Sequence, residues 1–140
     1  MTEIDLGLTH VALPVTDPDA SVAFYERYAA MKVVHRRRDE AAGTSVVWLS
    51  DLTRPFVIVL VESERVGGGL GGFAHLGVAC ESRDEVDRRG EEARSEGRAV
   101  LGPHDSGPPV GYWMFIADPD GHNLELSHGQ EVAVTIEHAT

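Results

Sequence analysis

The feature that most constrains the fold of this chain is an order of strands and helices that occurs twice. Residues 8–15 (LTHVALPV) are typical of a strand, and residues 17–18 (DP) after them are typical of a helix start. Residues 73–80 (FAHLGVAC) predict another strand, and residues 82–85 (SRDE) match the capping box of a second helix. Three more strand-forming stretches follow each predicted helix, at 31–38, 44–50 and 56–63 in the first half and at 98–103, 111–119 and 122–129 in the second. The chain is therefore predicted to contain two βαβββ units.

Matching positions in the two halves indicate an internal duplication. His10 and His75 are each third in their predicted strands and lie 65 residues apart, and the corners at Asp51 and Asp118 match at an offset of 67. Between the halves, residues 66–72 (VGGGLGG) are predicted to be a flexible linker, because they lack the strand-then-helix setting of a dinucleotide loop. We expect no nucleotide site.

The repeat defines the expected fold class and domain organisation. We expect an α+β fold in which two βαβββ modules form a curved, half-barrel mixed sheet around a central cavity. The modules are predicted at residues 6–64 and 72–129, followed by a C-terminal tail at 130–140, all within a single domain spanning residues 1–140.

Charge and composition exclude several classes of partner. With 12 basic and 23 acidic residues the formal net charge is -11, which should repel nucleic acid and anionic membrane surfaces. The acidic start of the chain lacks the features of a signal peptide, and no apolar stretch approaches the length of a membrane span. We therefore expect a cytoplasmic protein whose partners are small molecules. Cys80 is the single cysteine, so it cannot form an internal disulfide and is predicted to pack as a small apolar residue.

The alternation of side chains along each strand separates three polar residues from the predicted core. In the first strand, Leu13 and its apolar neighbours predict a helix-covered face, which leaves His10 on the opposite face. In the fifth strand, Leu76 belongs to the packed face and His75 to the other. In the last strand, the leucines on either side of Glu125 are predicted to lie on the packed face. Glu125 is therefore predicted to point the other way, into the cavity enclosed by the curved sheet.

These three side chains suggest a metal site. A buried, unpaired carboxylate costs several kcal/mol, and a cation held by neutral imidazoles is one way to offset that cost. His10, His75 and Glu125 on separate strands form a three-ligand set that leaves coordination positions for water or substrate. Such an open set is typical of catalytic rather than structural metal sites.

Three motifs resemble those of a known family. The stretches LTHVALPVTD, FAHLGVAC and FIADPDGHNLEL resemble the vicinal oxygen chelate superfamily, which includes glyoxalase I, fosfomycin-resistance transferases, extradiol dioxygenases, methylmalonyl-CoA epimerases and bleomycin-binding proteins. The resemblance covers nearly the whole chain and implies paired βαβββ modules around a divalent metal ion, often in a homodimer. By position, the metal ligands of the family correspond to His10, His75 and Glu125.

The chain departs from several members of this family. Glyoxalase-type members have a further glutamate on the fourth strand, where this chain offers Ile58 or Val59, and Glu62 could replace it only in a different register. Extradiol dioxygenases have a catalytic tyrosine ten residues before the last ligand, where Phe115 stands here, and Tyr112 has the other parity. The transferases use a lysine and serines from the loop before the seventh strand, and this loop has no lysine. Bleomycin-binding members have lost the ligands that this chain retains.

We therefore expect a metal-dependent lyase or isomerase that stabilises an enolate or oxyanion of a small organic substrate. The ion is Fe, Mn, Zn or Ni, and proton transfer is assigned to Glu62, His104 or metal-bound hydroxide, beside the ligand Glu125. An apolar substrate pocket is predicted from four aromatic residues, Trp48, Phe73, Trp113 and Phe115. His122 is expected in a turn, and three further histidines are expected in water, namely His35, His128 and His138. The alternatives are an extradiol-type dioxygenase with a two-histidine, one-carboxylate iron site and a bleomycin-resistance-type drug-binding protein.

Overall fold

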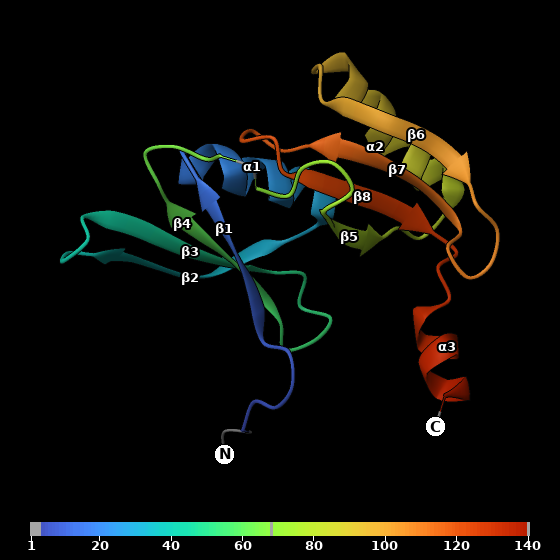
Figure 1. The fold of residues 1–140 in the computed structure, drawn as a ribbon, viewed down its shortest axis with the longest axis horizontal. Helices are drawn as coiled ribbons and strands as arrows, with labels where there is room; N and C mark the ends of the chain where they lie inside the picture. The colour runs from blue at the N-terminus through green and yellow to red at the C-terminus, as the bar shows by residue number, and fades with distance from the viewer. Residues whose placement is uncertain (1–3, 68, 140) are drawn as a thin grey trace. The chain divides into compact units, whose positions relative to one another are not determined.

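The computed structural model describes residues 4–67 and 69–139 and confirms the α+β fold class (Figure 1). Its described strands form two separate four-stranded mixed sheets, neither of them closed. The chain divides into two compact units, Met1–Gly69 and Leu70–Thr140, so the boundary falls in the glycine-rich stretch predicted as a linker. Gly68 of that stretch lies outside the described residues. Among the helices that the structure describes, none has the length and apolar character needed to cross a membrane.

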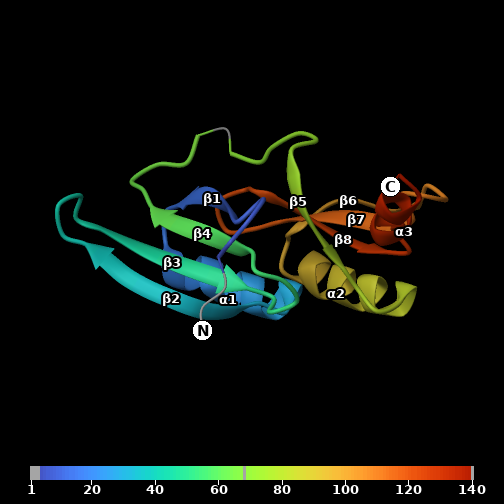
Figure 2. The ribbon, with the colours of Figure 1, turned by 90° about the horizontal axis from the view of Figure 1, so that it is seen from below.

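The first unit has the predicted βαβββ order. Its elements are β1 (His10–Val15), α1 (Pro18–Ala29), β2 (Lys32–Asp39), β3 (Thr44–Ser50) and β4 (Val57–Glu62). The sheet order is β1-β4-β3-β2, in which β1 pairs with β4 in parallel and the other neighbours are antiparallel. In the first unit, α1 covers one face of this sheet (Figure 2).

The start and the buried side of α1 follow from its sequence. The Asp17 carboxylate accepts hydrogen bonds from the backbone N–H groups of Asp19 and Ala20, which satisfies two donors at the helix start. Two tyrosines of the helix, Tyr25 and Tyr28, are almost fully buried against the sheet. This apolar packing leaves the other face of the first sheet open.

The second unit repeats the pattern and adds one helix. Its elements are β5 (His75–Ala79), α2 (Arg83–Ser95), β6 (Ala99–Asp105), β7 (Tyr112–Ala117), β8 (Asn123–His128) and α3 (Val132–His138). The sheet order is β5-β8-β7-β6, with β5 parallel to β8. The Ser82 hydroxyl accepts a hydrogen bond from the backbone N–H of Glu85 at 3.1 Å, as a helix cap should. The residues predicted as a tail, 130–140, contain α3, which buries none of its residues.

Candidate metal centre and substrate pocket

The second unit brings His75 and Glu125 together. The parallel pairing of β5 with β8 aligns Gly77 with Glu125, two residues after His75 on the same face. His75 Nε2 lies 3.5 Å from Glu125 Oε2. The other ring nitrogen, Nδ1, lies 2.5 Å from the backbone carbonyl oxygen of Phe73. Since a carbonyl only accepts, Nδ1 must donate, and the Nε2 of a neutral ring then presents its lone pair to the carboxylate.

Each carboxylate oxygen of Glu125 has its own contact. The Nε2 amide of Gln130 donates to Oε1 at 2.9 Å, while Oε2 faces His75. Burial raises the pKa of the Glu125 carboxyl, and the nearby His75 and the Gln130 hydrogen bond oppose that rise. Glu125 is only 7% exposed, so an anionic carboxylate here needs a positive partner.

Aromatic rings surround this pair on the open face of the second sheet. Phe115 aligns with Glu125 in the β7–β8 pairing, and its ring centroid lies 4.6 Å from that of His75. Phe73 and Trp113 lie 6.4 and 5.2 Å from the Phe115 ring. His104 on β6 lies 5.4 Å from Trp113. Three of the four predicted pocket aromatics and one predicted base therefore form a continuous row with His75.

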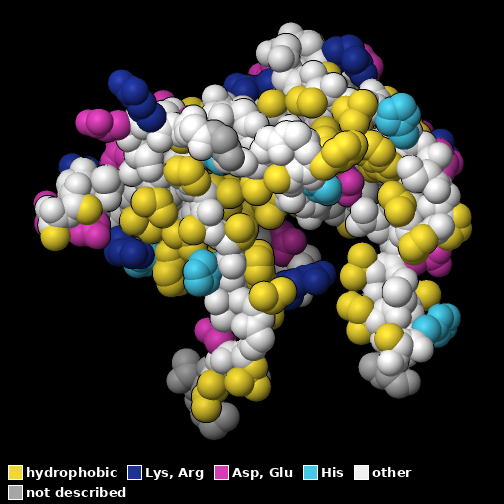
Figure 3. Space-filling model, viewed as in Figure 1, with side chains coloured by type: hydrophobic (Ala, Val, Ile, Leu, Met, Phe, Trp, Pro, Cys, Tyr) yellow, Lys and Arg dark blue, Asp and Glu magenta, His cyan; other side chains and the backbone are white. Residues whose placement is uncertain are grey.

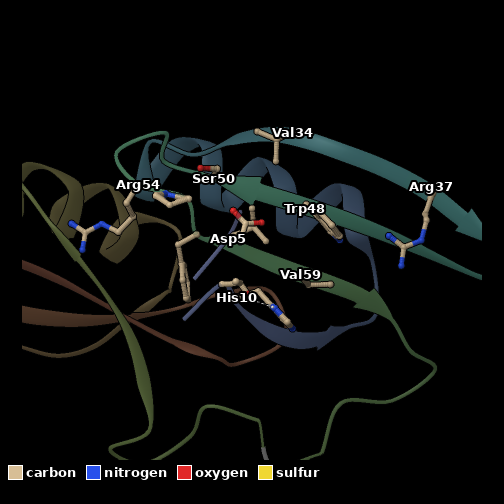
Figure 4. Close-up of a pocket in the computed structure, with 12 residues that line it drawn as sticks. Asp5, His10, Val34, Arg37, Trp48, Ser50, Arg54 and Val59 are labelled. Atoms are coloured by element: carbon tan, nitrogen blue, oxygen red, sulfur yellow. Dashed lines mark hydrogen bonds between the residues drawn. The ribbon is translucent and has the colours of Figure 1, made fainter. Parts of the chain in front are cut away.

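His10 lies in the first unit, on the open face of its sheet. Its Nδ1 is 2.9 Å from the hydroxyl oxygen of Thr9, and its backbone pairs with Val57 of β4. A pocket of about 530 Å³ opens beside it (Figure 4). The residues that line the pocket are Asp5, Thr9, His10, Val34, Arg37, Trp48, Ser50, Arg54, Pro55, Phe56, Val57 and Val59. Trp48, the fourth predicted aromatic, thus shares a pocket with His10.

Trp48 is also the contact point for two other side chains. Its ring lies 4.8 Å from the His35 ring, and the Arg37 guanidinium lies 6.0 Å from its centroid. The indole Nε1 is buried and has no hydrogen-bond acceptor among the described residues. A buried donor without an acceptor is costly, so the Trp48 indole carries an unfavourable term that its ring packing must offset.

The structure does not place Glu62 with His10. The β1–β4 register aligns Ala12 with Val59, so Val59 occupies the position that Glu125 has opposite Gly77 in the second unit. Val59 and Val61 point to one face of β4, and Glu62 points to the opposite face, which the helix covers. Its carboxylate accepts a hydrogen bond from the backbone N–H of Ser45 at 2.9 Å. The prediction of Glu62 as a base or fourth ligand is therefore not supported by this register.

Two histidines that were expected in water are half-buried instead. His35 stacks on Trp48, and His128 shares a hydrogen bond of 2.9 Å with the backbone carbonyl of Cys80. His138 is exposed, as expected. His122 lies in the turn before β8, as predicted, but it is 1% exposed and its Nδ1 accepts a hydrogen bond from the backbone N–H of Leu70. The order of polar and apolar residues along the chain did not reveal these contacts.

The paired His75 and Glu125 fit a divalent ion. Their facing atoms, His75 Nε2 and Glu125 Oε2 at 3.5 Å, are a nitrogen and an oxygen donor of the kinds that bind zinc and other first-row divalent ions. Within the described part of either unit, no three His, Cys, Asp or Glu side chains gather at one point. The second unit alone therefore offers two ligands, and His10 of the first unit remains the predicted third.

Comparisons with known proteins agree with this architecture. A sequence model of the Glyoxalase/Bleomycin resistance protein/Dioxygenase superfamily matches residues 7–126. An uncharacterized Pseudomonas aeruginosa protein, PA2024, is 36% identical over 126 residues, which cover 88% of this chain and 89% of that protein.

Solved structures show the same fold at low sequence identity. The fosfomycin resistance protein FosX from Listeria monocytogenes matches with a TM-score of 0.71 and 20% identity, over 91% of this chain and 96% of its own. The trypanothione-dependent glyoxalase I of Leishmania major matches with a TM-score of 0.68 and 22% identity, over 96% and 93%. A variant of FosX was solved in complex with Mn(II) and dihydroxypropylphosphonic acid. This chain belongs to the Glyoxalase/Bleomycin resistance protein/Dioxygenase superfamily.

Proposed function

We propose that this protein is a divalent-metal-dependent enzyme, a lyase or isomerase that acts on a small organic substrate. The observation that carries the proposal is the pair of His75 Nε2 and Glu125 Oε2, 3.5 Å apart, with the ring orientation held by the Phe73 carbonyl. A histidine that donates its second nitrogen to a carbonyl is a common arrangement for a metal ligand. The Mn(II) complex of a FosX variant, which shares this fold, supports the choice of a divalent ion.

The residues around the pair have distinct parts in the proposed reaction. His75, Glu125 and His10 would hold the ion, and Gln130 would keep the carboxylate of Glu125 turned toward it. Bound there, the ion would act as a Lewis acid that stabilises enolate or oxyanion charge on the substrate. The Phe115 ring excludes water from one side of His75. His104 is the remaining proposed base, because its ring lies 5.4 Å from that of Trp113, in the row of rings that includes His75.

The two alternative functions have less support. A dioxygenase of the extradiol type would be expected to present a phenol where the Phe115 ring packs on His75. A binder of cationic drugs would be expected to line its pocket with acidic groups, whereas two arginines and one aspartate line the pocket beside His10.

A homodimer in the cytoplasm is also part of the proposal. Exposed apolar side chains gather on the segment before β1 and on α3 (Figure 3). They are Ile4, Leu6, Leu8, Val132, Val134 and Ile136. Apolar side chains in such number are suited to burial against a second copy of the chain. Light scattering after size-exclusion chromatography tests this, and a monomer at micromolar concentration would contradict it.

Titration calorimetry of metal-free protein tests the metal site directly. Mn(II), Zn(II) and Ni(II) are each titrated into the wild type, His75→Gln, Glu125→Gln and the control His138→Gln. We expect one site per chain in the wild type and in the control, and binding at least about tenfold weaker in the other two variants, as for the loss of a ligand. A wild type that binds none of these ions, or a His75→Gln variant that binds them equally well, contradicts the proposal. Oxygen uptake by the iron-loaded protein with catechols would indicate the dioxygenase instead.

A further inference from the structure

The pocket of the first unit combines an apolar lining with positive charge. Its largest apolar side chains are Trp48, Phe56 and three valines, and its volume of about 530 Å³ suits a small organic molecule. Two arginines against one aspartate give the lining a positive balance, although the whole chain carries a formal charge of -11. Positive charge is thus concentrated in a pocket of a strongly acidic protein.

Arg37 differs from its two neighbours on β2. Arg36 pairs with Asp19 at 3.3 Å, and Arg38 lies 3.9 Å from Glu62 and donates to the Gly43 carbonyl at 2.8 Å. Arg37 makes no ion pair with any described residue. Its guanidinium instead lies 6.0 Å from the centre of the Trp48 ring. Three consecutive arginines are therefore divided into two that pair with acids and one that faces the pocket.

The position of Arg37 distinguishes it from the other arginine of the lining. Figure 4 shows Arg37 at one end of the pocket, on the side of the sheet where Trp48, His10 and Val59 lie. Arg54 lies at the opposite end and extends away from these residues. A molecule seated between His10 and Trp48 would therefore meet the guanidinium of Arg37.

We propose that the substrate is a small organic anion with a flat apolar body, and that Arg37 binds its carboxylate or phosphonate group. A guanidinium over an aromatic ring keeps its N–H groups free at the edge and matches two anionic oxygens at once. The face and edge of Trp48 hold the apolar body, and His10 marks the reacting end. This inference rests on the proposed function, since it identifies the substrate class of the same enzyme.

Fragment binding to the metal-free protein tests the inference. The probes are benzoate and phenylphosphonate, with benzamide and benzylamine as neutral and cationic analogues, and binding is measured by calorimetry and tryptophan fluorescence. We expect both anions to bind at least about tenfold more tightly than benzylamine, because only they can pair with Arg37. The relative affinity of the two anions identifies which anionic group the pocket prefers.

Matched arginine variants assign the effect to one side chain. Arg37→Gln should weaken benzoate binding roughly tenfold to a hundredfold, as for the loss of a charge-assisted hydrogen bond, while Arg37→Lys should retain part of it. The control Arg36→Gln should stay within about twofold of the wild type, because Arg36 pairs with Asp19 and does not line the pocket. Arg54→Gln removes the other arginine of the lining and is measured as the competing assignment. Circular dichroism verifies that each variant is folded.

The outcomes separate this inference from the proposed function. Benzylamine binding as tight as benzoate, or an unchanged Arg37→Gln variant, overturns the inference even if the protein binds Mn(II). Benzoate binding that depends on Arg37 in a protein without metal affinity supports the anion pocket and contradicts the metal enzyme. Loss of benzoate binding in Arg54→Gln alone would overturn the assignment to Arg37.

Discussion

Removal of the Gln130 amide should weaken metal binding without removing a ligand. The Gln130 Nε2 donates to Glu125 Oε1 at 2.9 Å, and the acceptor is 7% exposed whereas the donor residue is exposed. A hydrogen bond to a charged group contributes about 1.5–3 kcal/mol, and the exposure of Gln130 reduces this to about 1 kcal/mol. Since about 1.4 kcal/mol is a tenfold change in affinity, we expect Gln130→Met to bind Mn(II) roughly fivefold more weakly than the wild type.

Calorimetry and the Mn(II) electron paramagnetic resonance spectrum together measure this effect. The spectrum reports the symmetry of the ligands, so a carboxylate that has turned should change it even where the affinity changes little. Glu131→Gln is the matched control, because it alters the next residue and no contact of Glu125. Equal affinity and an identical spectrum for Gln130→Met and wild type would refute the reasoning that Gln130 orients the carboxylate.

Three further predictions concern stability and reactivity. Gly111 and Gly129 share a φ of 85°, but a Cβ at Gly111 would lie 2.5 Å from the backbone oxygen of His128, whereas Gly129 has open space. Both alanine variants should therefore lose about 1–2 kcal/mol of unfolding free energy, measured in urea, because alanine is strained in a left-handed backbone conformation. Gly111→Ala should lose at least about 1 kcal/mol more, because its Cβ would overlap the His128 backbone oxygen, and equal losses in the two variants would refute that overlap. Asp17→Ala should cost about 1 kcal/mol through loss of the α1 cap, measured in the same assay, and an unchanged midpoint would contradict it. Burial raises the pKa of the Cys80 thiol, so less thiolate is present at pH 8, and a disulfide reagent should react slowly until urea is added; rapid reaction of the native protein would show that Cys80 is accessible.

The fold class and the sheet face on which each candidate ligand lies could be predicted from the sequence. Both depend on the alternation of polar and apolar residues within each strand. His10 and His75 lie on the faces opposite Leu13 and Leu76, as the order of polar and apolar residues in their strands indicated. Glu125 lies between two fully buried leucines and is oriented with Gly77 and His75 for the same reason. Successive side chains of a strand point to opposite faces, so the face of each residue can be predicted from that strand alone, without knowledge of the strand it pairs with.

The features that the sequence did not reveal depend on contacts that the alternation of side chains along a strand does not specify. The Gln130 hydrogen bond to Glu125 joins a loop to a strand, and the side-chain pattern of the strand does not extend into the loop. The choice between Ile58 and Val59 required the pairing of β1 with β4, which only the structure supplies. The distinction between Arg37 and its paired neighbours depended on acids 17 and 24 residues away, at Asp19 and Glu62. The short helix α3 has β-branched residues at four of its seven positions, which favour a strand as readily as a helix.

Each module has one histidine at a matching position of its first strand, but the modules differ at the residue paired with the second position after that histidine. Gly77 of β5 aligns with Glu125, and the equivalent Ala12 of β1 aligns with Val59. The second module therefore presents a carboxylate beside its histidine, where a cation is favoured. The first presents an apolar side chain that lines a pocket. A carboxylate in place of Val59 would add negative charge to the pocket of the first unit, so the valine suits the pocket that Arg37 makes positive. The fourth strands of the two modules thus differ in residue type at one matched position, which is Val59 on β4 and Glu125 on β8.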